Sequence, residues 1–176
     1  MFHRSERLFL RPAFPEDWQA IHARVSDEGV VRNLARAPWP YGEADARLFA
    51  SMKQDPRLPH FLVTLPGEGV IGSAGLGEHG GQPEIGYWIG RDYWGQGYAT
   101  EAGRAVVNIA RTLGHRRLTA GHFVDNPASG QVLRNLGFRP TGQIRQRHSL
   151  ARGGEVASVE FELDLGAASM ELPRAA

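Results

Sequence analysis

Residues 94–102 read Trp-Gly-Gln-Gly-Tyr-Ala-Thr-Glu-Ala, between a segment with strand-like alternation and a segment with helical periodicity. The two glycines, Gly95 and Gly97, let the main chain approach a ligand closely because they carry no Cβ atom. The helix that begins here directs unpaired N–H groups and a partial positive charge outward, and phosphate groups bind well at such a helix start. The stretch therefore predicts an anion-binding turn.

Three phosphate-binding turns can be compared with this stretch. A Walker loop requires Gly-Lys-Ser/Thr, and no lysine stands here. A Rossmann fingerprint requires a third glycine where Thr100 stands, and the preceding strands look antiparallel. The pyrophosphate loop of an acyl-CoA-binding protein remains. A tight strand-to-helix turn without a ligand is the alternative that the spacing alone leaves open.

Hydrophobic periodicity around this turn predicts a mixed sheet with helices. Strands are expected at residues 7–12, 60–65, 69–76, 84–90, 118–124, 138–144 and 155–165, and helices at 15–25, 43–54, 99–113 and from Asn126 to Gly137. The three strands between residues 60 and 90 are separated by turn residues and form an antiparallel meander. This order is neither a regular βα alternation nor a helix bundle, so it indicates an α/β fold with a mixed sheet.

Length and composition describe an ordinary globular chain. Its 176 residues suit one domain, expected at residues 1–166, followed by a flexible tail at 167–176. The net charge of +1 does not favour direct binding to nucleic acid. The absence of cysteine excludes disulfides, a thiolate nucleophile and Cys-ligated metals. No signal peptide and no run of roughly 18 apolar residues is visible, so we expect a cytoplasmic protein without a membrane partner.

Three motifs, in this order, resemble the GNAT acetyltransferases, and in particular the RimJ/RimL type that acetylates ribosomal-protein N-termini. They are Glu84-Ile85-Gly86-Tyr87-Trp88-Ile89, the stretch 94–102, and Asp125-Asn126-Pro127-Ala128-Ser129 followed by Leu133-Arg134-Asn135-Leu136-Gly137-Phe138. The family motif Gln/Arg-x-x-Gly-x-Gly/Ala matches at Gly97 and Ala99, but Trp94 replaces its first residue. The resemblance covers residues 7–165 and implies the GNAT fold, a central, mostly antiparallel sheet with about four helices.

The resemblance also implies acetyl-CoA as the acetyl donor. Its phosphates would be held by Trp94, Gly95, Gln96, Gly97, Tyr98, Ala99 and Thr100. Its pantetheine arm would pair with the main chain at Trp88 and Ile89, and an N–H group near Ile89 would polarise the thioester carbonyl. Asn126 would contact the pantetheine amides. Asn126 is also a good helix N-cap before Pro127, and the two roles are compatible.

Acetyl transfer to an amine needs a proton acceptor, and Glu84 is the candidate base. Strand alternation places Glu84 on the same face as Gly86 and Trp88, near the expected thioester. A partly buried carboxylate can take a proton there, directly or through water. The alternative is a solvated glutamate at a strand edge.

The acid that helps the thiolate to leave is less well defined. Many members of the family use a tyrosine at the position where this chain has Leu133. The resemblance offers Ser129 in its place, as a hydroxyl that donates a hydrogen bond to the leaving sulfur. The alternative is that Ser129 is only a polar residue in the first turn of its helix.

Acceptor selection is assigned by resemblance to the first two helices and the loop 37–42, where Trp39 and Tyr41 would wall a pocket. Glu84 would also contact the acceptor. The alternative is that both rings pack on the core. No histidine stands in a metal-binding pattern, so no metal site is expected. His79 and His122 lie near the expected cleft, where surface or hydrogen-bonded histidines are the simpler interpretation.

A basic cluster follows near the C-terminus: Arg145, Arg147, His148 and Arg152. It could meet an acidic peptide or ribosomal RNA, whereas the simpler interpretation is a solvated loop.

These features predict an N-acetyltransferase that uses acetyl-CoA and a primary amine in a ternary complex, because no cysteine is available for a covalent route. The first candidate acceptor is a protein or peptide N-terminal α-amine. The second is a small amine, namely an amino acid, a polyamine or an aminoglycoside. A non-catalytic acyl-CoA sensor is the alternative of another class, which the leucine at position 133 favours. A homodimer is compatible with the resemblance.

Overall fold

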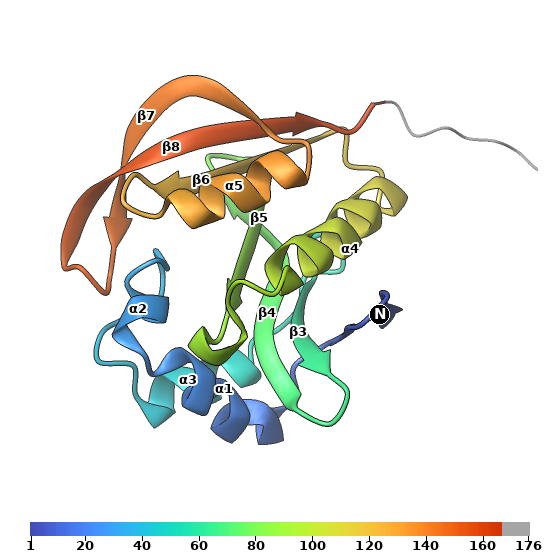
Figure 1. The fold of residues 1–176 in the computed structure, drawn as a ribbon, viewed down its shortest axis with the longest axis vertical. Coiled ribbons are helices and arrows are strands. Elements are labelled where there is room, and N and C mark those ends of the chain that lie inside the picture. The colour runs from blue at the N-terminus through green and yellow to red at the C-terminus, as the bar shows by residue number, and fades with distance from the viewer. Residues whose placement is uncertain (167–176) are drawn as a thin grey trace, which may run out of the picture.

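A computed structural model describes residues 1–166, which share one open eight-stranded sheet with helices on both of its faces (Figure 1). The expected C-terminal tail, residues 167–176, lies outside the described residues. The strands are β1 (His3–Arg4), β2 (Phe9–Arg11), β3 (His60–Leu65), β4 (Gly69–His79), β5 (Gln82–Ile89), β6 (Arg117–Phe123), β7 (Arg139–Ser149) and β8 (Gly154–Asp164). The helices are η1 (Pro15–Asp17), α1 (Trp18–Val25), α2 (Glu28–Val31), α3 (Glu43–Ala50), η2 (Arg91–Tyr93), α4 (Tyr98–Thr112) and α5 (Pro127–Asn135), where η marks a 3-10 turn.

The predicted mixed fold is confirmed, with corrections at several boundaries. β1 and α2 are additional elements of two and four residues, too short to produce a periodic pattern. α3 ends at Ala50 rather than residue 54. β7 continues to Ser149, so most of the basic cluster lies in a strand and not in a loop. Most of β7 is exposed on both sides, and its sequence therefore lacks the apolar alternation that reveals a half-buried strand.

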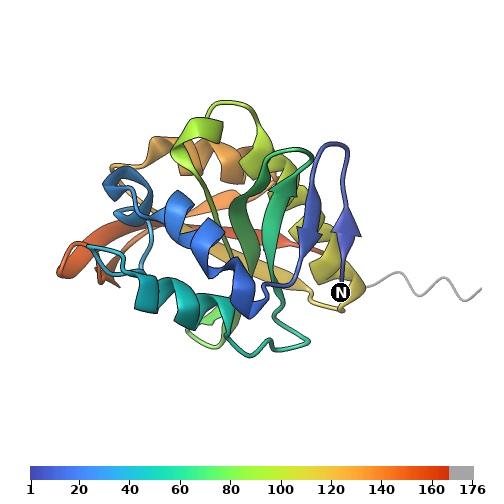
Figure 2. The same cartoon turned by 90° about the horizontal axis from the view of Figure 1, so that it is seen from below.

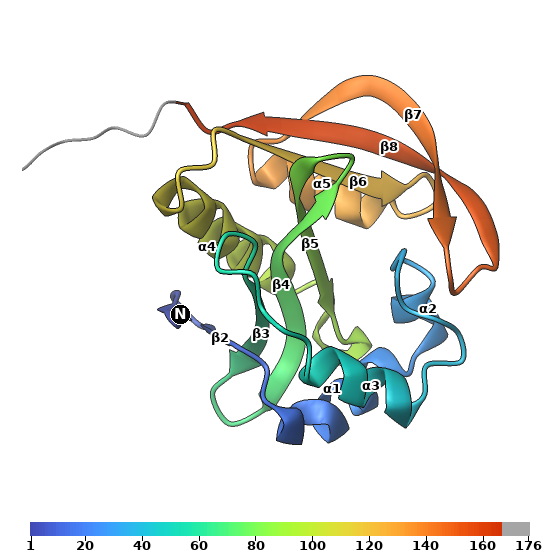
Figure 3. The same cartoon turned by 180° about the vertical axis from the view of Figure 1, so that it is seen from behind.

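The order of strands in the sheet is β1-β2-β3-β4-β5-β6-β8-β7. Neighbours are antiparallel except β5 and β6, which run parallel and pair in register at one position, Glu84 with Thr119. β4 and β5, in contrast, stay in register from Gly72/Ile89 to His79/Gln82. The sheet therefore divides beyond Glu84 into a β1–β5 part and a β6–β8 part, and Figure 3 shows the two strands diverging.

Two apolar cores hold the helices on opposite faces of the sheet. α4 and α5 pack over the larger core, and α1 and α3 lie side by side over the smaller one (Figure 2). The strand period is clear in β3, where Phe61 and Val63 belong to the larger core and Leu62 to the smaller. Because both faces are buried, the helices fix the positions of β4, β5 and β6 on either side of the divergence.

We expect Leu118→Ala to destabilise the fold by about 2–5 kcal/mol, because Leu118 is 0% exposed and its removal leaves a cavity in the larger core. Leu48→Ala is the matched control, since Leu48 is 72% exposed on α3 and its truncation should change stability by less than about 0.5 kcal/mol. Urea unfolding of both variants measures the difference. Equal losses in the two variants would contradict the core described above.

Candidate active site

The turn before α4 has the geometry of an anion-binding site. Gly95 and Gly97 have φ values of +73° and +82°, in the left-handed region that favours glycine. A Cβ atom at Gly95 would meet no atom within 4 Å, so a ligand can approach the main chain. Gly97 is the N-cap of the fifteen-residue α4, and within residues 1–166 no side chain caps its first N–H groups. These donors suit the phosphate groups of CoA, as predicted for residues 94–100.

The side chains of this turn have different roles from its main chain. The ring of Tyr98 is 9% exposed and packs into the larger core, so only its N–H group is available at the turn. Trp94, which replaces the Gln/Arg of the family motif, donates from Nε1 to the carbonyl oxygen of Ile89 at 2.6 Å. The indole therefore fastens the turn to the end of β5.

Arg7, which the sequence analysis did not single out, supports the same turn. Its Nε and main-chain N each lie 2.7 Å from the Glu101 carboxylate on α4, and its Nη1 donates to the Gln96 carbonyl at 3.1 Å. Burial raises the pKa of the Glu101 carboxyl, but hydrogen bonds from Arg7 and Ser5 outweigh it and hold the pKa below its usual value. The partners lie 94 residues apart, so no local pattern could reveal the contact.

The edge of β5 that faces β6 offers free main-chain groups. The N–H of Gly90 donates to the Ile71 carbonyl in β4 at 2.8 Å. Because successive residues of a strand point their N–H groups in opposite directions, the N–H of Ile89 points away from β4 and toward the divergence. This orientation supports the predicted donor at Ile89. The side chain of Trp88 packs against the smaller core.

The start of α5 forms the facing wall. The Oδ1 of Asn126 accepts a hydrogen bond from the N–H of Ser129 at 3.3 Å, which confirms the N-cap interpretation. Its contact with pantetheine stays a prediction. Leu133 is 1% exposed in the larger core and offers no hydroxyl to the site.

Tyr87 of β5 reaches α5 from the opposite side. Its hydroxyl lies 3.0 Å from the Oγ of Ser129 and 3.2 Å from the carbonyl oxygen of the same residue. Burial raises the pKa of the Tyr87 phenol to about 12, despite the hydrogen bond with Ser129. Strand alternation places this ring on the face opposite Glu84, and no role was predicted for it.

Glu84 lies on the other face of β5 in a group of three charged side chains. The Nη2 of Arg147 lies 2.6 Å from Glu84 Oε1 and 2.9 Å from Glu160 Oε2. All three side chains are less than 20% exposed, so Glu84 is not a solvated strand-edge residue. Burial alone would lower the pKa of Arg147, but its bonds to Glu160 and Glu84 raise it above its ordinary value. A Cβ at Gly121 would lie 2.9 Å from the Arg147 guanidinium carbon, so that glycine makes room for it.

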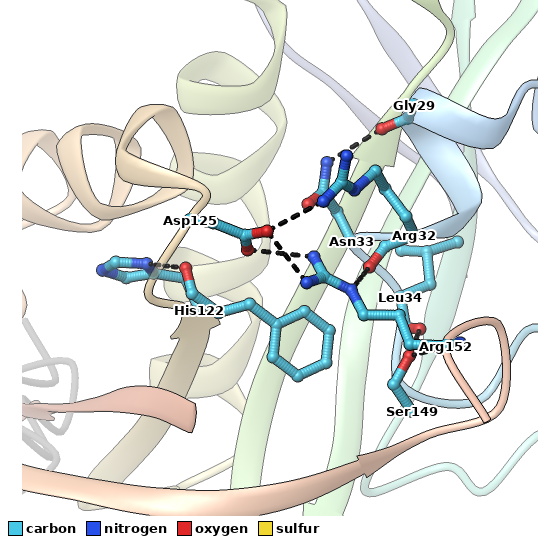
Figure 4. A network of polar contacts seen from close by, with 9 residues as sticks. Gly29, Arg32, Asn33, Leu34, His122, Asp125, Ser149 and Arg152 are labelled. Atoms are coloured by element: carbon cyan, nitrogen blue, oxygen red, sulfur yellow. Dashed lines mark hydrogen bonds and ion pairs between the residues drawn. The ribbon is translucent and has the colours of Figure 1, made fainter. Parts of the chain in front are cut away.

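Arg152 of the basic cluster is also paired with a carboxylate. Arg152 donates to both oxygens of Asp125 at 2.9 Å, and Arg32 donates to Asp125 Oδ2 at 2.9 Å (Figure 4). Hydrogen bonds from Arg152 hold the pKa of the Asp125 carboxyl below its usual range. The N–H of Leu150 also donates to the Ala35 carbonyl at 3.0 Å. These contacts fasten the β7–β8 turn to the loop after α2.

The remaining predicted residues are placed as follows. Tyr41 is 7% exposed within the smaller core, so the prediction that it walls an open pocket is wrong and the core-packing alternative holds. Trp39 is 41% exposed and stays a candidate wall. The Nδ1 of His122 lies 2.9 Å from the Phe123 carbonyl, which matches the hydrogen-bonded interpretation. His79 is exposed at the end of β4.

Comparison with known proteins assigns the family. The model of the GNAT acetyltransferase domain matches residues 7–139. The chain therefore belongs to the GNAT acetyltransferases and is an acetyl-CoA-dependent N-acetyltransferase. Within residues 1–166, none of the helices has both the length and the apolar composition required to cross a membrane.

Three relatives illustrate the similarity. An uncharacterized N-acetyltransferase, YoaA of Bacillus subtilis, is 31% identical over 150 residues, covering 81% of this chain and 85% of YoaA. The ribosomal-protein-serine acetyltransferase of Escherichia coli is 37% identical over 68 residues, 38% of each chain. The solved structure of RimL, a ribosomal L7/L12 α-N-protein acetyltransferase in complex with coenzyme A, has a TM-score of 0.78 at 21% identity, covering 93% of this chain and 98% of that one.

We expect Gly97→Ala to weaken coenzyme A binding about tenfold or more, because an alanine at φ +82° is strained and shifts the N–H groups at the start of α4. Gly142→Ala is the control, since Gly142 has φ +80° in β7, away from this turn. Both variants should lose about 1–2 kcal/mol of stability, but only the first should lose affinity. Calorimetric titration with coenzyme A measures the difference, and equal affinities would contradict the assignment of the turn.

Proposed function

We propose that this chain acetylates the N-terminal α-amine of a protein or peptide, with acetyl-CoA on the α4–α5 face of the sheet and the amine on the Glu84 face. The observation that carries the proposal is the divergence of β5 from β6 beyond Glu84 and Thr119. It connects a phosphate-binding turn on one side with a buried carboxylate on the other. The two substrates can therefore meet between the strands without a covalent enzyme intermediate.

The residues on the α4–α5 face bind acetyl-CoA and orient it. The glycine turn and the start of α4 hold the phosphates, and the free edge of β5 holds the amides of the pantetheine arm. Acetyl-CoA supplies an activated acetyl group as a thioester. The N–H of Ile89 then stabilises negative charge on the carbonyl oxygen during attack, and Ser129 donates a hydrogen bond to the departing sulfur.

The residues on the Glu84 face take up the proton that the amine loses. An α-amino group has a pKa of about 7.7–8.0, so a useful fraction is neutral at neutral pH. Glu84 takes the proton that the nitrogen loses when the C–N bond forms, directly or through water. Arg147 fixes one carboxylate oxygen, Oε1, and leaves Oε2 for this task.

A polar hollow lies beside these charged residues, and we infer that it would hold the further residues of an extended acceptor. Its volume is about 570 Å³, and it lies between the β4–β5 turn and strands β6, β7 and β8. Thr119, which pairs with Glu84, and Glu160, which pairs with Arg147, both line it. The similarity to the ribosomal-protein-serine acetyltransferase of Escherichia coli supports the same class of acceptor.

The acceptor class is tested by incubating the chain with labelled acetyl-CoA and two pools, unmodified peptides with free N-termini and free small amines. We expect labelled peptides whose α-nitrogen carries the acetyl group, identified by fragment mass. Labelled small amines alone would replace the proposed acceptor with the second candidate. Coenzyme A binding without transfer to either pool would instead favour a sensor.

We expect Glu84→Gln to lower kcat by about 100-fold, at the lower end of the range for a general base, because an α-amine needs little help. The neutral amide keeps the shape of the side chain but cannot accept the proton. Glu78→Gln is the control, since Glu78 is exposed on the same hairpin. Steady-state rates with saturating peptide measure both variants, and an unchanged kcat for Glu84→Gln would remove Glu84 as the base.

A further inference from the structure

The contact between Tyr87 and Ser129 joins the two walls between which the thioester would lie. Tyr87 belongs to β5 and Ser129 to the first turn of α5, and their hydroxyl oxygens are 3.0 Å apart. Tyr87 stands two residues before Ile89 on the same face of the strand. Its ring packs against the larger core, so it has little freedom to turn away.

Each of the two hydroxyl groups can donate only one hydrogen bond, which limits how the pair can be arranged. The Tyr87 hydroxyl has one hydrogen, and both the Oγ and the carbonyl oxygen of Ser129 are within its reach. The Oγ is the nearer of the two, at 3.0 Å against 3.2 Å, and the carbonyl oxygen also accepts the N–H four residues further along α5. When Tyr87 donates to Oγ, the hydrogen of the Ser129 hydroxyl becomes free for a third atom.

We propose that Tyr87 is a positioning residue that donates to Ser129 Oγ and so directs the Ser129 hydroxyl hydrogen at the sulfur of the departing thiolate. The inference rests on the proposed function, in which Ser129 contacts that sulfur. A serine hydroxyl alone can rotate among several partners. A fixed donor behind it holds one rotamer and strengthens the outgoing hydrogen bond, because chained hydrogen bonds polarise one another.

Tyr87 does not give up its own proton. Its pKa of about 12 lies well above that of a free thiol, about 8.5. Transfer from the phenol to the thiolate is therefore unfavourable. The phenol stays protonated across the neutral range and acts as a permanent donor.

Acetyl transfer then needs no side chain that donates a proton to the leaving group. The C–N bond forms and the C–S bond breaks, with the electron pair leaving on sulfur. The proton from the nitrogen goes to Glu84 or to water. The thiolate is stabilised by the Ser129 hydroxyl, and it takes a proton from solvent after release. Leu133 has no hydroxyl, so the hydrogen bond to the sulfur comes from Ser129, and Tyr87 only orients that hydroxyl.

The test is the pKa of the coenzyme A thiol when it is bound to the protein. The chain contains no cysteine, so the thiolate absorbance of a complex with coenzyme A alone comes from the ligand once the titration of the protein is subtracted. We expect Tyr87→Phe and Ser129→Ala each to raise this pKa by about one pH unit, a tenfold loss of thiolate stabilisation. The combined variant should match Ser129→Ala, because Tyr87 acts through Ser129.

Turnover provides a second readout. We expect Tyr87→Phe to lower kcat about tenfold without changing the affinity for coenzyme A more than twofold. The control is Tyr93→Phe, which removes a hydroxyl that donates to Glu68 away from α5 and should leave kcat and the thiol pKa unchanged. A lower melting temperature of Tyr87→Phe without a change in thiol pKa would mean a purely structural hydroxyl.

Two results would overturn the inference: a thiol pKa that Tyr87→Phe leaves unchanged, or an effect of Tyr87→Phe that persists at full size in the Ser129→Ala background. These results are distinct from failure of the proposed function. A chain that shows the expected thiol pKa pattern but acetylates no peptide N-terminus would retain the Tyr87–Ser129 contact and lose the proposed acceptor.

Discussion

The single in-register pair between β5 and β6 is the constraint on which the site depends. Beyond Glu84 and Thr119 the two strands diverge, and main-chain groups such as the N–H of Ile89 have no strand to pair with. Unpaired main-chain groups are costly when they are removed from water, so a divergence inside a sheet needs a partner. A ligand that carries amides along an extended arm can pair with the edge of β5 as an added strand does. The unpaired edge of β5 is therefore suited to bind such an arm.

A divergence of this kind persists only if both halves of the sheet are held from outside. The large core under α4 and α5 supplies most of the free energy, and charged contacts then fix the loops at the two sides. Arg7 with Glu101 fixes the turn before α4, and Arg152 with Asp125 fixes the β7–β8 turn. Asp125 is 41% exposed, so its pairs with Arg152 and Arg32 add little to stability. Their contribution is to position the loops.

The sequence predicted the elements well and the contacts across them poorly, for identifiable physical reasons. Apart from the exposed β7, the longer strands and the four longer helices follow from local periodicity. The glycine turn follows from the need for positive φ before α4. The N-cap role of Asn126 is likewise local. The pairing of Arg147 with Glu84 is not local, because the arginine side chain reaches from β7 past β8 and β6 to β5. An exposed edge strand such as β7 also carries no apolar pattern that could reveal this contact. The role of Tyr41 could not be decided for a similar reason, since an aromatic ring in a proline-rich loop fits a pocket and a core equally well.

The Arg147 group bears on how an amine that is mostly protonated in water becomes a nucleophile. One guanidinium between two carboxylates leaves a net charge of −1 in a place that is less than 20% exposed. A negative centre with little water around it attracts a cationic group, so the ammonium form of the proposed acceptor would be drawn toward Glu84. Removing Arg147 would leave two unpaired carboxylates close together, which is far more costly than removing Glu84. The arginine is therefore needed so that a carboxylate can stand at this position at all, and the carboxylate is the part of the group that can meet the amine.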